Sequence, residues 1–198
     1  MRLTAPLILA SVSPRRKQLL RSLKVPFKVI PSYLSEPSPG ALTPSAYTRK
    51  LALAKAVFVA QKLERGLVLG ADTVVVHRGR ILGKPADFTE ACRMLSLLQG
   101  TTHRVVTGVA LVDAATGKKK LAHALSRVTL RKIPLKQIGR IAAKHLDKAG
   151  AYAAQEKKDP LVLKVKGSYT NVVGLPMKLV KKLLKGYLDQ NVYRDALA

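Results

Sequence analysis

The stretch Ser11-Val12-Ser13-Pro14-Arg15-Arg16 joins a short apolar run, residues 6–10, to a segment from Lys17 onward with apolar residues at helical spacing. Ser13 is a typical N-cap and Pro14 a typical first helical residue, so the stretch predicts a strand followed directly by a helix. The free N–H groups and the dipole of a first helical turn favour an anion, and guanidinium groups bind phosphate oxygens in pairs. The stretch is therefore a candidate phosphate site, although a capped surface helix with solvated arginines fits the same residues.

The chain as a whole is strongly basic and has the size of one compact fold. Its 198 residues are 47% hydrophobic, and 36 Lys and Arg against 11 Asp and Glu give a formal charge of +25. We expect a single domain over residues 1–198 and a surface that attracts polyanions such as nucleotides, nucleic acid or anionic lipid. The one cysteine, Cys92, excludes an internal disulfide and is expected to pack in a core. His77 and His103 have no partner at metal-ligand spacing, so we expect structural or surface roles for them.

Cellular location is predicted from the apolar segments. None of them approaches the ~20 residues of a membrane span, and Pro6 interrupts the apolar N-terminal run. We therefore expect a cytoplasmic protein with no membrane partner.

Apolar periodicity alternates along the chain between strand-like and helix-like segments, which predicts an α/β fold. Beyond the first strand and helix, we expect strands at 27–30, 67–76, 81–82, 103–112, 121–133 and 161–165, and helices at 44–63, 87–100, 134–145 and from 175 onward. Asp87 and Glu90 resemble a capping box at the start of one of these helices.

Asp72 stands apart from the few other acidic residues. It lies inside the apolar run 67–76, where an ionised carboxylate is costly unless cations or hydrogen bonds compensate it. Backbone donors near the strand end are one explanation. The other is a functional carboxylate that shares a divalent ion with substrate phosphates, with Glu36 as the second ligand. Lys84, directly before Pro85, can reach a phosphate as a point charge, though a single lysine is more often solvated.

Motifs over nearly the whole chain resemble, in order and spacing, those of the Maf-like nucleoside triphosphate pyrophosphatases. The matching segments are Ser11–Arg16, Glu36, Lys55 within 51–56, Gly70–Thr73, Lys84-Pro85, Thr107–Val109, Asp147–Tyr152 with Gln155, Gly167–Tyr169 and Asn171–Pro176. The resemblance implies a Maf- or ITPase-like α/β fold: an elongated mixed β-sheet flanked by helices, two lobes with a central cleft, and assembly as a homodimer.

The resemblance also implies a cytoplasmic hydrolase that uses a divalent metal cation, Mg²⁺ or Mn²⁺, to convert a nucleoside triphosphate to the monophosphate and pyrophosphate. Asp72 would be the catalytic base and, with Glu36, a metal ligand. Substrate binding would fall to Ser13, Arg15, Arg16, Lys55, Thr73, Lys84 and Gln155. Arg15, Thr73 and Gln155 resemble the branch that acts on dTTP and UTP. A role in limiting the incorporation of modified nucleotides, or in arresting septum formation, is implied as well.

The chain departs from the family pattern in two places. Lys144-His145 stands where relatives usually have Glu-Pro, which predicts weaker activity. Glu156 and Asp159 follow Gln155 where glycine is usual, which predicts altered base selectivity. The excess of lysine and arginine supports an alternative, a basic nucleotide- or nucleic-acid-binding protein of the same fold with little turnover. The sequence has no helix-turn-helix, zinc finger or aromatic platform to favour it.

Overall fold

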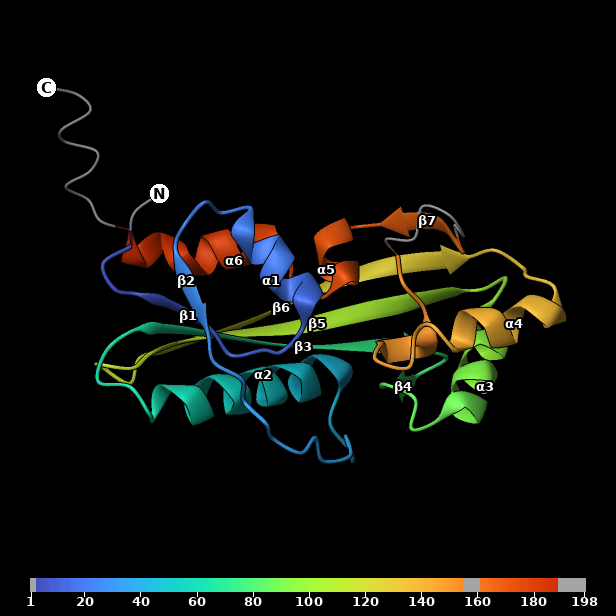
Figure 1. Cartoon of the computed structure of the whole chain (residues 1–198), viewed down its shortest axis with the longest axis horizontal. Helices are drawn as coiled ribbons and strands as arrows, with labels where there is room; N and C mark the ends of the chain where they lie inside the picture. Colours follow the sequence, from blue (N-terminus) through green and yellow to red (C-terminus); the bar gives the residue numbers. More distant parts are fainter. Residues whose placement is uncertain (1–2, 155–160, 189–198) are drawn as a thin grey trace, which may run out of the picture.

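A single mixed β-sheet runs the length of the elongated molecule (Figure 1). The computed structural model describes residues 3–154 and 161–188. Its seven described strands are β1 (Leu7–Leu9), β2 (Phe27–Val29), β3 (Leu67–His77), β4 (Arg80–Leu82), β5 (Thr102–Asp113), β6 (Lys119–Leu130) and β7 (Val162–Lys166). The order across the sheet is β2-β1-β3-β5-β6-β7, with β4 also paired to β3. β1 runs parallel to β2 and β3, whereas the other pairs are antiparallel. The predicted α/β class and mixed sheet are confirmed.

Helices cover both faces of this sheet. They are α1 (Pro14–Arg21), α2 (Pro44–Ala60), α3 (Phe88–Leu98), α4 (Leu135–Ala142), α5 (Tyr169–Val173) and α6 (Met177–Leu184). Because side chains alternate along a strand, β1 and β3 send Leu9 and Leu69 into a core with α1 and α6, and Ile8 and Val68 into a core with α2 on the other face. A further core with α3 and α4 fills the opposite end of the molecule (Figure 1). Cys92 packs against that core, as expected.

The region after β7 differs from the sequence prediction. A short helix, α5, occupies Tyr169–Val173, where no helix was expected, and α6 begins at Met177 rather than at Leu175. Ser168 caps α5 by accepting a hydrogen bond from the N–H of Asn171 at 3.2 Å. Gly174 then adopts φ 115°, a conformation that ends the helix and suits glycine. The predicted C-terminal helix is therefore present as α6, and an additional short helix precedes it, separated from it by the left-handed turn at Gly174.

Other predicted elements are present, with ends that differ by a few residues. The helix expected at 134–145 spans Leu135–Ala142, and the strand expected at 121–133 spans Lys119–Leu130. The predicted capping box is half formed. Asp87 accepts from the N–H of Glu90 at 2.7 Å, while the carboxylate of Glu90 accepts from the N–H of Ala86 instead of that of Asp87. None of the helices within residues 3–154 and 161–188 is long and apolar enough to cross a membrane.

The candidate functional residues lie at a gap along one edge of β3. β1 pairs with β3 at Leu67–Leu69, and β4 pairs with the same edge of β3 only from Val75 to His77. Between these strands, residues 70–74 of β3 border an opening. Asp72 projects from one face of β3 towards α2, and Thr73 projects from the other face towards α1. Side chains from both faces of the sheet thus reach one opening.

Candidate active site

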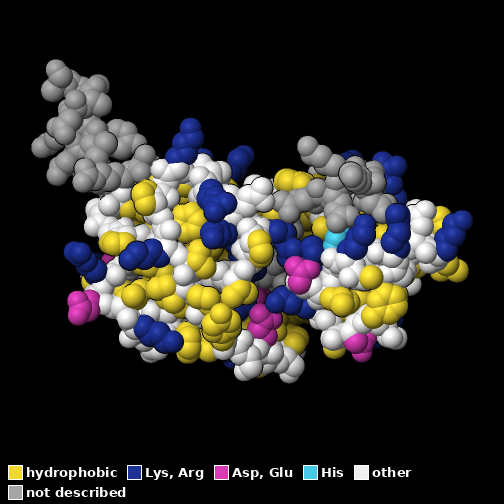
Figure 2. Space-filling view, viewed as in Figure 1, with side chains coloured by type: hydrophobic (Ala, Val, Ile, Leu, Met, Phe, Trp, Pro, Cys, Tyr) yellow, Lys and Arg dark blue, Asp and Glu magenta, His cyan; other side chains and the backbone are white. Residues whose placement is uncertain are grey.

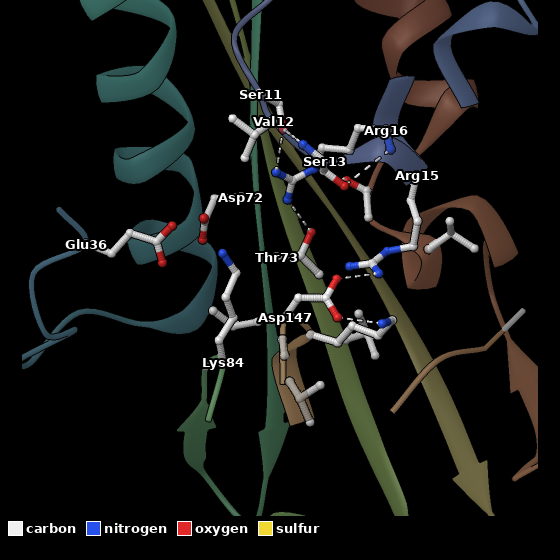
Figure 3. A pocket seen from close by; sticks show the side chains of 18 of the residues that line it. Ser11, Val12, Ser13, Arg15, Arg16, Glu36, Asp72, Thr73, Lys84 and Asp147 are labelled. Atoms are coloured by element: carbon white, nitrogen blue, oxygen red, sulfur yellow. Dashed lines mark hydrogen bonds and ion pairs between the residues drawn. The ribbon is translucent and has the colours of Figure 1, made fainter. Parts of the chain in front are cut away.

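A cavity of about 530 Å³ occupies this gap. The space-filling view shows the hollow between the two halves of the molecule, with acidic and basic side chains next to one another (Figure 2). The predicted site residues that line it are Ser13, Arg15, Arg16, Glu36, Lys55, Asp72, Thr73 and Lys84. Gln155 lies outside the described residues. Segments far apart in the sequence therefore supply one pocket (Figure 3).

Two carboxylates of the pocket, those of Glu36 and Asp72, share one ammonium group. Lys55 on α2 donates to Oε1 of Glu36 and to Oδ1 of Asp72, each at 2.7 Å. The Asp72 side chain is only 6% exposed, so the cation compensates a carboxylate that would otherwise be costly to bury. The hydroxyl of Tyr47 donates to the carbonyl of Pro37 at 2.8 Å and so holds the loop that carries Glu36.

The charges around Glu36 favour its ionised form. Burial by itself would raise its pKa, but the hydrogen bond from Lys55 and the attraction of Lys55, Lys84 and Arg16 outweigh burial and lower the pKa of Glu36 below its usual value. The amine of Lys84 points towards Glu36 and Asp72 in Figure 3. The carboxylates of Glu36 and Asp72 thus face a common cation position, which the ammonium group of Lys55 occupies in this structure.

This donor set fits a hard divalent cation. Carboxylate oxygens are the ligands that Mg²⁺ and Mn²⁺ prefer, and such ions are commonly held by one or two carboxylates together with waters and substrate phosphates. In the described part of the chain, His, Cys, Asp and Glu form no cluster of three or more that could hold a metal ion. Glu36 and Asp72, whose carboxylates lie on the same ammonium group, are the pair of residues that could hold such an ion.

The first turn of α1 forms as the sequence predicts. Ser13 is the N-cap and accepts from the N–H of Arg16 at 3.4 Å, with Pro14 as the first helical residue. The Oγ of Ser11 accepts from the N–H of Ser13 at 3.2 Å, which fixes the turn between β1 and α1. Arg15 and Arg16, although adjacent, point to different partners (Figure 3).

Arg16 connects three parts of the chain. Its Nε donates to the carbonyl of Gly174 at 2.9 Å, Nη1 to Oγ of Ser11 at 3.3 Å and Nη2 to Oγ1 of Thr73 at 3.1 Å. Burial lowers the pKa of Arg16, while Asp72 and Glu36 oppose that decrease. Three of its five N–H donors are committed to the protein, so Arg16 is held rigidly at the side of the pocket.

Arg15 on α1 reaches across the pocket to the segment that follows α4. Its Nη1 donates to Oδ2 of Asp147 at 3.1 Å, and Lys148 donates to the other oxygen of Asp147. Burial would raise the pKa of Asp147, but the hydrogen bond and charge of Lys148, and then those of Arg15, lower it.

The hydroxyl of Tyr152 and Nε2 of His103 form a buried hydrogen bond of 2.7 Å. His103 is thus a structural residue, as expected.

Comparison with known proteins identifies the family. The family model described as "Maf-like protein" matches residues 6–187. The chain belongs to the Maf-like family. Its predicted family membership is confirmed by curated relatives named dTTP/UTP pyrophosphatase. The relative from Pelotomaculum thermopropionicum is 46% identical over 183 residues, which are 91% of this chain and 96% of the relative. The relative from Moorella thermoacetica is 49% identical over 180 residues, or 90% and 93%.

A solved structure supports the fold of this Maf-like protein. The Ham1 protein of Staphylococcus aureus superposes with a TM-score of 0.52 at 14% sequence identity, covering 91% of this chain and 98% of that one. At this identity the likeness concerns the fold alone. It agrees with the ITPase-like architecture that the sequence motifs imply.

Several residues at the pocket of this Maf-like protein lie in the family motifs, but the sequence did not predict a function for them. They are Ser11, Asp147, Tyr152 and Gly174, which line the pocket, and Thr107, whose hydroxyl contacts that of Thr73. Their position within family motifs was the available signal. Their contacts depend on strand register and on the packing of α1 against α5, which local spacing does not reveal.

The departure at Lys144-His145 lies directly after α4. His145 is buried, and the carbonyl of Lys144 accepts from Nζ of Lys148 at 3.4 Å. The substituted pair therefore supports the segment that carries Asp147 and Lys148. Glu156 and Asp159, the other departures, lie outside the described residues.

Proposed function

We propose that this Maf-like protein hydrolyses dTTP and UTP to the nucleoside monophosphate and pyrophosphate, with Mg²⁺ or Mn²⁺ as cofactor. The observation that carries the proposal is the juxtaposition, in one pocket, of the carboxylates of Glu36 and Asp72 with a row of cations from α1, α2 and the loop after β4. A nucleoside triphosphate and a divalent ion require this combination of charges. The names of the curated relatives support the choice of substrates.

In this proposal, a metal ion bound by Glu36 and Asp72 would offset the negative charge of the triphosphate and make water a better nucleophile. Asp72 accepts a proton from the attacking water as the water oxygen bonds to the α-phosphorus. The bond from the α-phosphorus to the bridging oxygen breaks, and its electron pair leaves with pyrophosphate. Lys84 and Lys55 stabilise the charge that grows on this leaving group. Ser13, at the start of α1, and Arg16 add N–H donors and positive charge beside it.

In this proposal, the base is recognised on the side of the pocket that lies away from Glu36 and Asp72. Arg15 and Thr73 line the cavity between the carboxylates and the segment around Tyr152, and we propose that both contact the base. Gln155, outside the described residues, is proposed as a third contact on the basis of the family resemblance. The same resemblance supports a cytoplasmic homodimer, folded as one domain over residues 1–198. It also supports a role in limiting modified nucleotides or in arresting septum formation.

Product analysis tests the proposal directly. The protein is incubated with UTP or dTTP and Mg²⁺, and the nucleotides and phosphates are separated by anion exchange. We expect UMP or dTMP with an equal amount of pyrophosphate. Release of UDP and orthophosphate would contradict cleavage between the α and β phosphates. No turnover, together with nucleic-acid binding at physiological salt, would favour the alternative of a basic binding protein.

A further inference from the structure

A buried threonine lies behind the pocket and contacts a residue that lines it. Thr107 on β5 is directly opposite Thr73 on β3, and their hydroxyl oxygens are 3.0 Å apart. The Thr107 hydroxyl donates to the backbone carbonyl of Asn171 at 3.2 Å. Asn171 is buried and fixed, because its Nδ2 donates to the carbonyl of Val105 at 3.1 Å and to Oγ of Ser126 at 3.0 Å. The acceptor for the Thr107 proton is therefore held rigidly.

Counting protons gives these hydrogen bonds one direction. Each threonine has a single hydroxyl hydrogen. Because Thr107 donates its hydrogen to Asn171, the hydrogen between the two threonines must come from Thr73. Thr73 in turn accepts from Nη2 of Arg16 at 3.1 Å. The chain runs from Arg16 through Thr73 and Thr107 to Asn171, and it leaves Thr73 with one lone pair and no hydrogen to donate into the pocket.

We propose that Thr107 is a positioning residue that sets base selectivity by making Thr73 an obligate hydrogen-bond acceptor. Uracil and thymine carry an N3–H that can donate to the remaining lone pair of Thr73. Cytosine has a lone pair at N3, which that oxygen repels. Bound cytosine would therefore leave the Thr73 oxygen without a hydrogen-bond donor. An unpaired polar group of this kind lowers the affinity for the wrong base more than a difference in shape alone does. The inference rests on the proposed function for the identity of its substrates.

The test compares uridine and cytidine nucleotides in Thr107→Val, which removes the hydroxyl and keeps the shape of the side chain. Dissociation constants for the α,β-methylene analogues of UTP and CTP are measured by calorimetry, with pyrophosphate release from UTP and CTP alongside. We expect the wild type to favour the uridine analogue by about tenfold or more, the equivalent of one hydrogen bond. In Thr107→Val the Thr73 hydroxyl becomes free to donate, so the preference falls several-fold, through tighter cytidine binding. Thr107→Ser restores the preference.

A matched control exists elsewhere in the sheet, between β5 and β6. Thr102 and Thr129 form a second pair of threonines, with hydroxyl oxygens 2.8 Å apart, on an exposed part of β5 and β6. Thr102→Val removes one hydroxyl from that pair, and the uridine-to-cytidine ratio is expected to stay at the wild-type value. A general loss of stability would lower both affinities together, whereas the proposal concerns their ratio.

An unchanged ratio in folded Thr107→Val, or a wild type without preference, would overturn the inference. If Thr107→Val does not fold, Thr73→Val decides. It should lose affinity for the uridine analogue and keep that for the cytidine analogue, and an equal loss for both would overturn the inference. The binding data also separate the two proposals. A selective protein that releases no pyrophosphate would refute the proposed function alone, and a turnover enzyme with an unchanged ratio would refute this inference alone.

Discussion

Lys55 holds the carboxylates of Glu36 and Asp72 through one ammonium group, at 2.7 Å from each. The sequence suggested Lys55 as a ligand of the triphosphate, and that role stays a prediction. In the structure its partners are Glu36 and Asp72, so the lysine keeps two negative groups together that would otherwise repel each other. Oε1 of Glu36 and Oδ1 of Asp72 therefore converge on one cation position, which the Lys55 ammonium group occupies in this structure.

Glu36→Gln should raise the Mg²⁺ concentration needed for turnover. The substitution removes one of the two charged oxygen donors but preserves the size of the side chain, so we expect an increase on the order of tenfold in the half-saturating concentration. Pyrophosphate release measured across a Mg²⁺ series checks this. Glu64→Gln, at an exposed turn residue, is the matched control. An unchanged Mg²⁺ requirement in Glu36→Gln would remove Glu36 from the metal site.

His103 should make the fold sensitive to acid. Burial, and to a smaller degree the charge of His77, lowers the pKa of His103 from 6.5 to about 4. The unfolded chain therefore binds a proton below pH 6.5 that the folded protein does not bind until about pH 4, so stability falls as the pH decreases through this window. The expected loss between pH 8 and pH 5 is about 2 kcal/mol from this residue.

His103→Gln should remove that part of the acid sensitivity. Urea unfolding at pH 8 and pH 5 measures the free energy of unfolding, and the variant is expected to lose about 2 kcal/mol less than the wild type over this interval. His123→Gln, at an exposed histidine of β6, is the comparison variant. Equal acid sensitivity of the wild type and His103→Gln would contradict a neutral buried His103.

The close packing of α2 on the sheet brings Lys55 to Asp72. Gly70 on β3 and Gly108 on β5 lie directly under the helix. A Cβ at Gly70 would be 2.2 Å from the carbonyl oxygen of Ala52, and one at Gly108 would be 2.3 Å from the carbonyl of Thr48. Backbone atoms of a helix cannot move aside without moving the helix. These two glycines therefore set the distance between α2 and β3.

Gly108→Ala is expected to destabilise the protein and to reduce turnover. The added methyl group must displace α2, which costs about 1–3 kcal/mol and shifts Lys55 relative to Asp72. Gly139→Ala, in the middle of α4, is the opposite case. Its Cβ would meet only the end of the Phe88 ring, at 3.4 Å, so we expect a gain of about 0.5–1 kcal/mol. Urea unfolding checks both changes, and a Gly108→Ala variant as stable as the wild type would contradict this packing.

Local patterns in the sequence predicted most helices and strands but not how they meet. The N-cap at Ser13 and the strand that carries Asp72 depend on neighbouring residues, and both were predicted correctly. The helix α5 was missed because five residues are too few for a periodic pattern, although Ser168 was an available capping signal. The role of Thr107 was also missed, since its contact with Thr73 depends on the register between β3 and β5.

Positive charge is distributed over the visible face of the molecule and is not confined to the pocket (Figure 2). With a formal charge of +25, the protein attracts any polyanion over a distance set by the ionic strength. A tetra-anionic nucleotide should therefore associate faster at low salt. This field explains attraction to the pocket without requiring a nucleic-acid site.

The value of kcat/KM for UTP should fall several-fold between about 20 and 500 mM KCl, because salt screens this attraction. Initial rates at subsaturating UTP, with free Mg²⁺ held constant, measure the effect. We expect kcat to change much less than kcat/KM. A salt-independent kcat/KM would show that the charge does not steer the substrate. Binding of duplex DNA or RNA that persists at physiological salt would favour the alternative function.

Pyrophosphate release from UTP by the wild type and by Asp72→Asn tests the central claim most directly. Asparagine keeps the shape of the side chain but has neither the charge to bind a metal ion nor the basicity to accept a proton. Asp113→Asn, at the last residue of β5, is the matched control. We predict that wild type and Asp113→Asn release pyrophosphate, whereas Asp72→Asn remains folded and loses turnover by about a thousandfold or more. Turnover near the wild-type rate in folded Asp72→Asn would contradict the assignment of Asp72 and of this pocket as the active site.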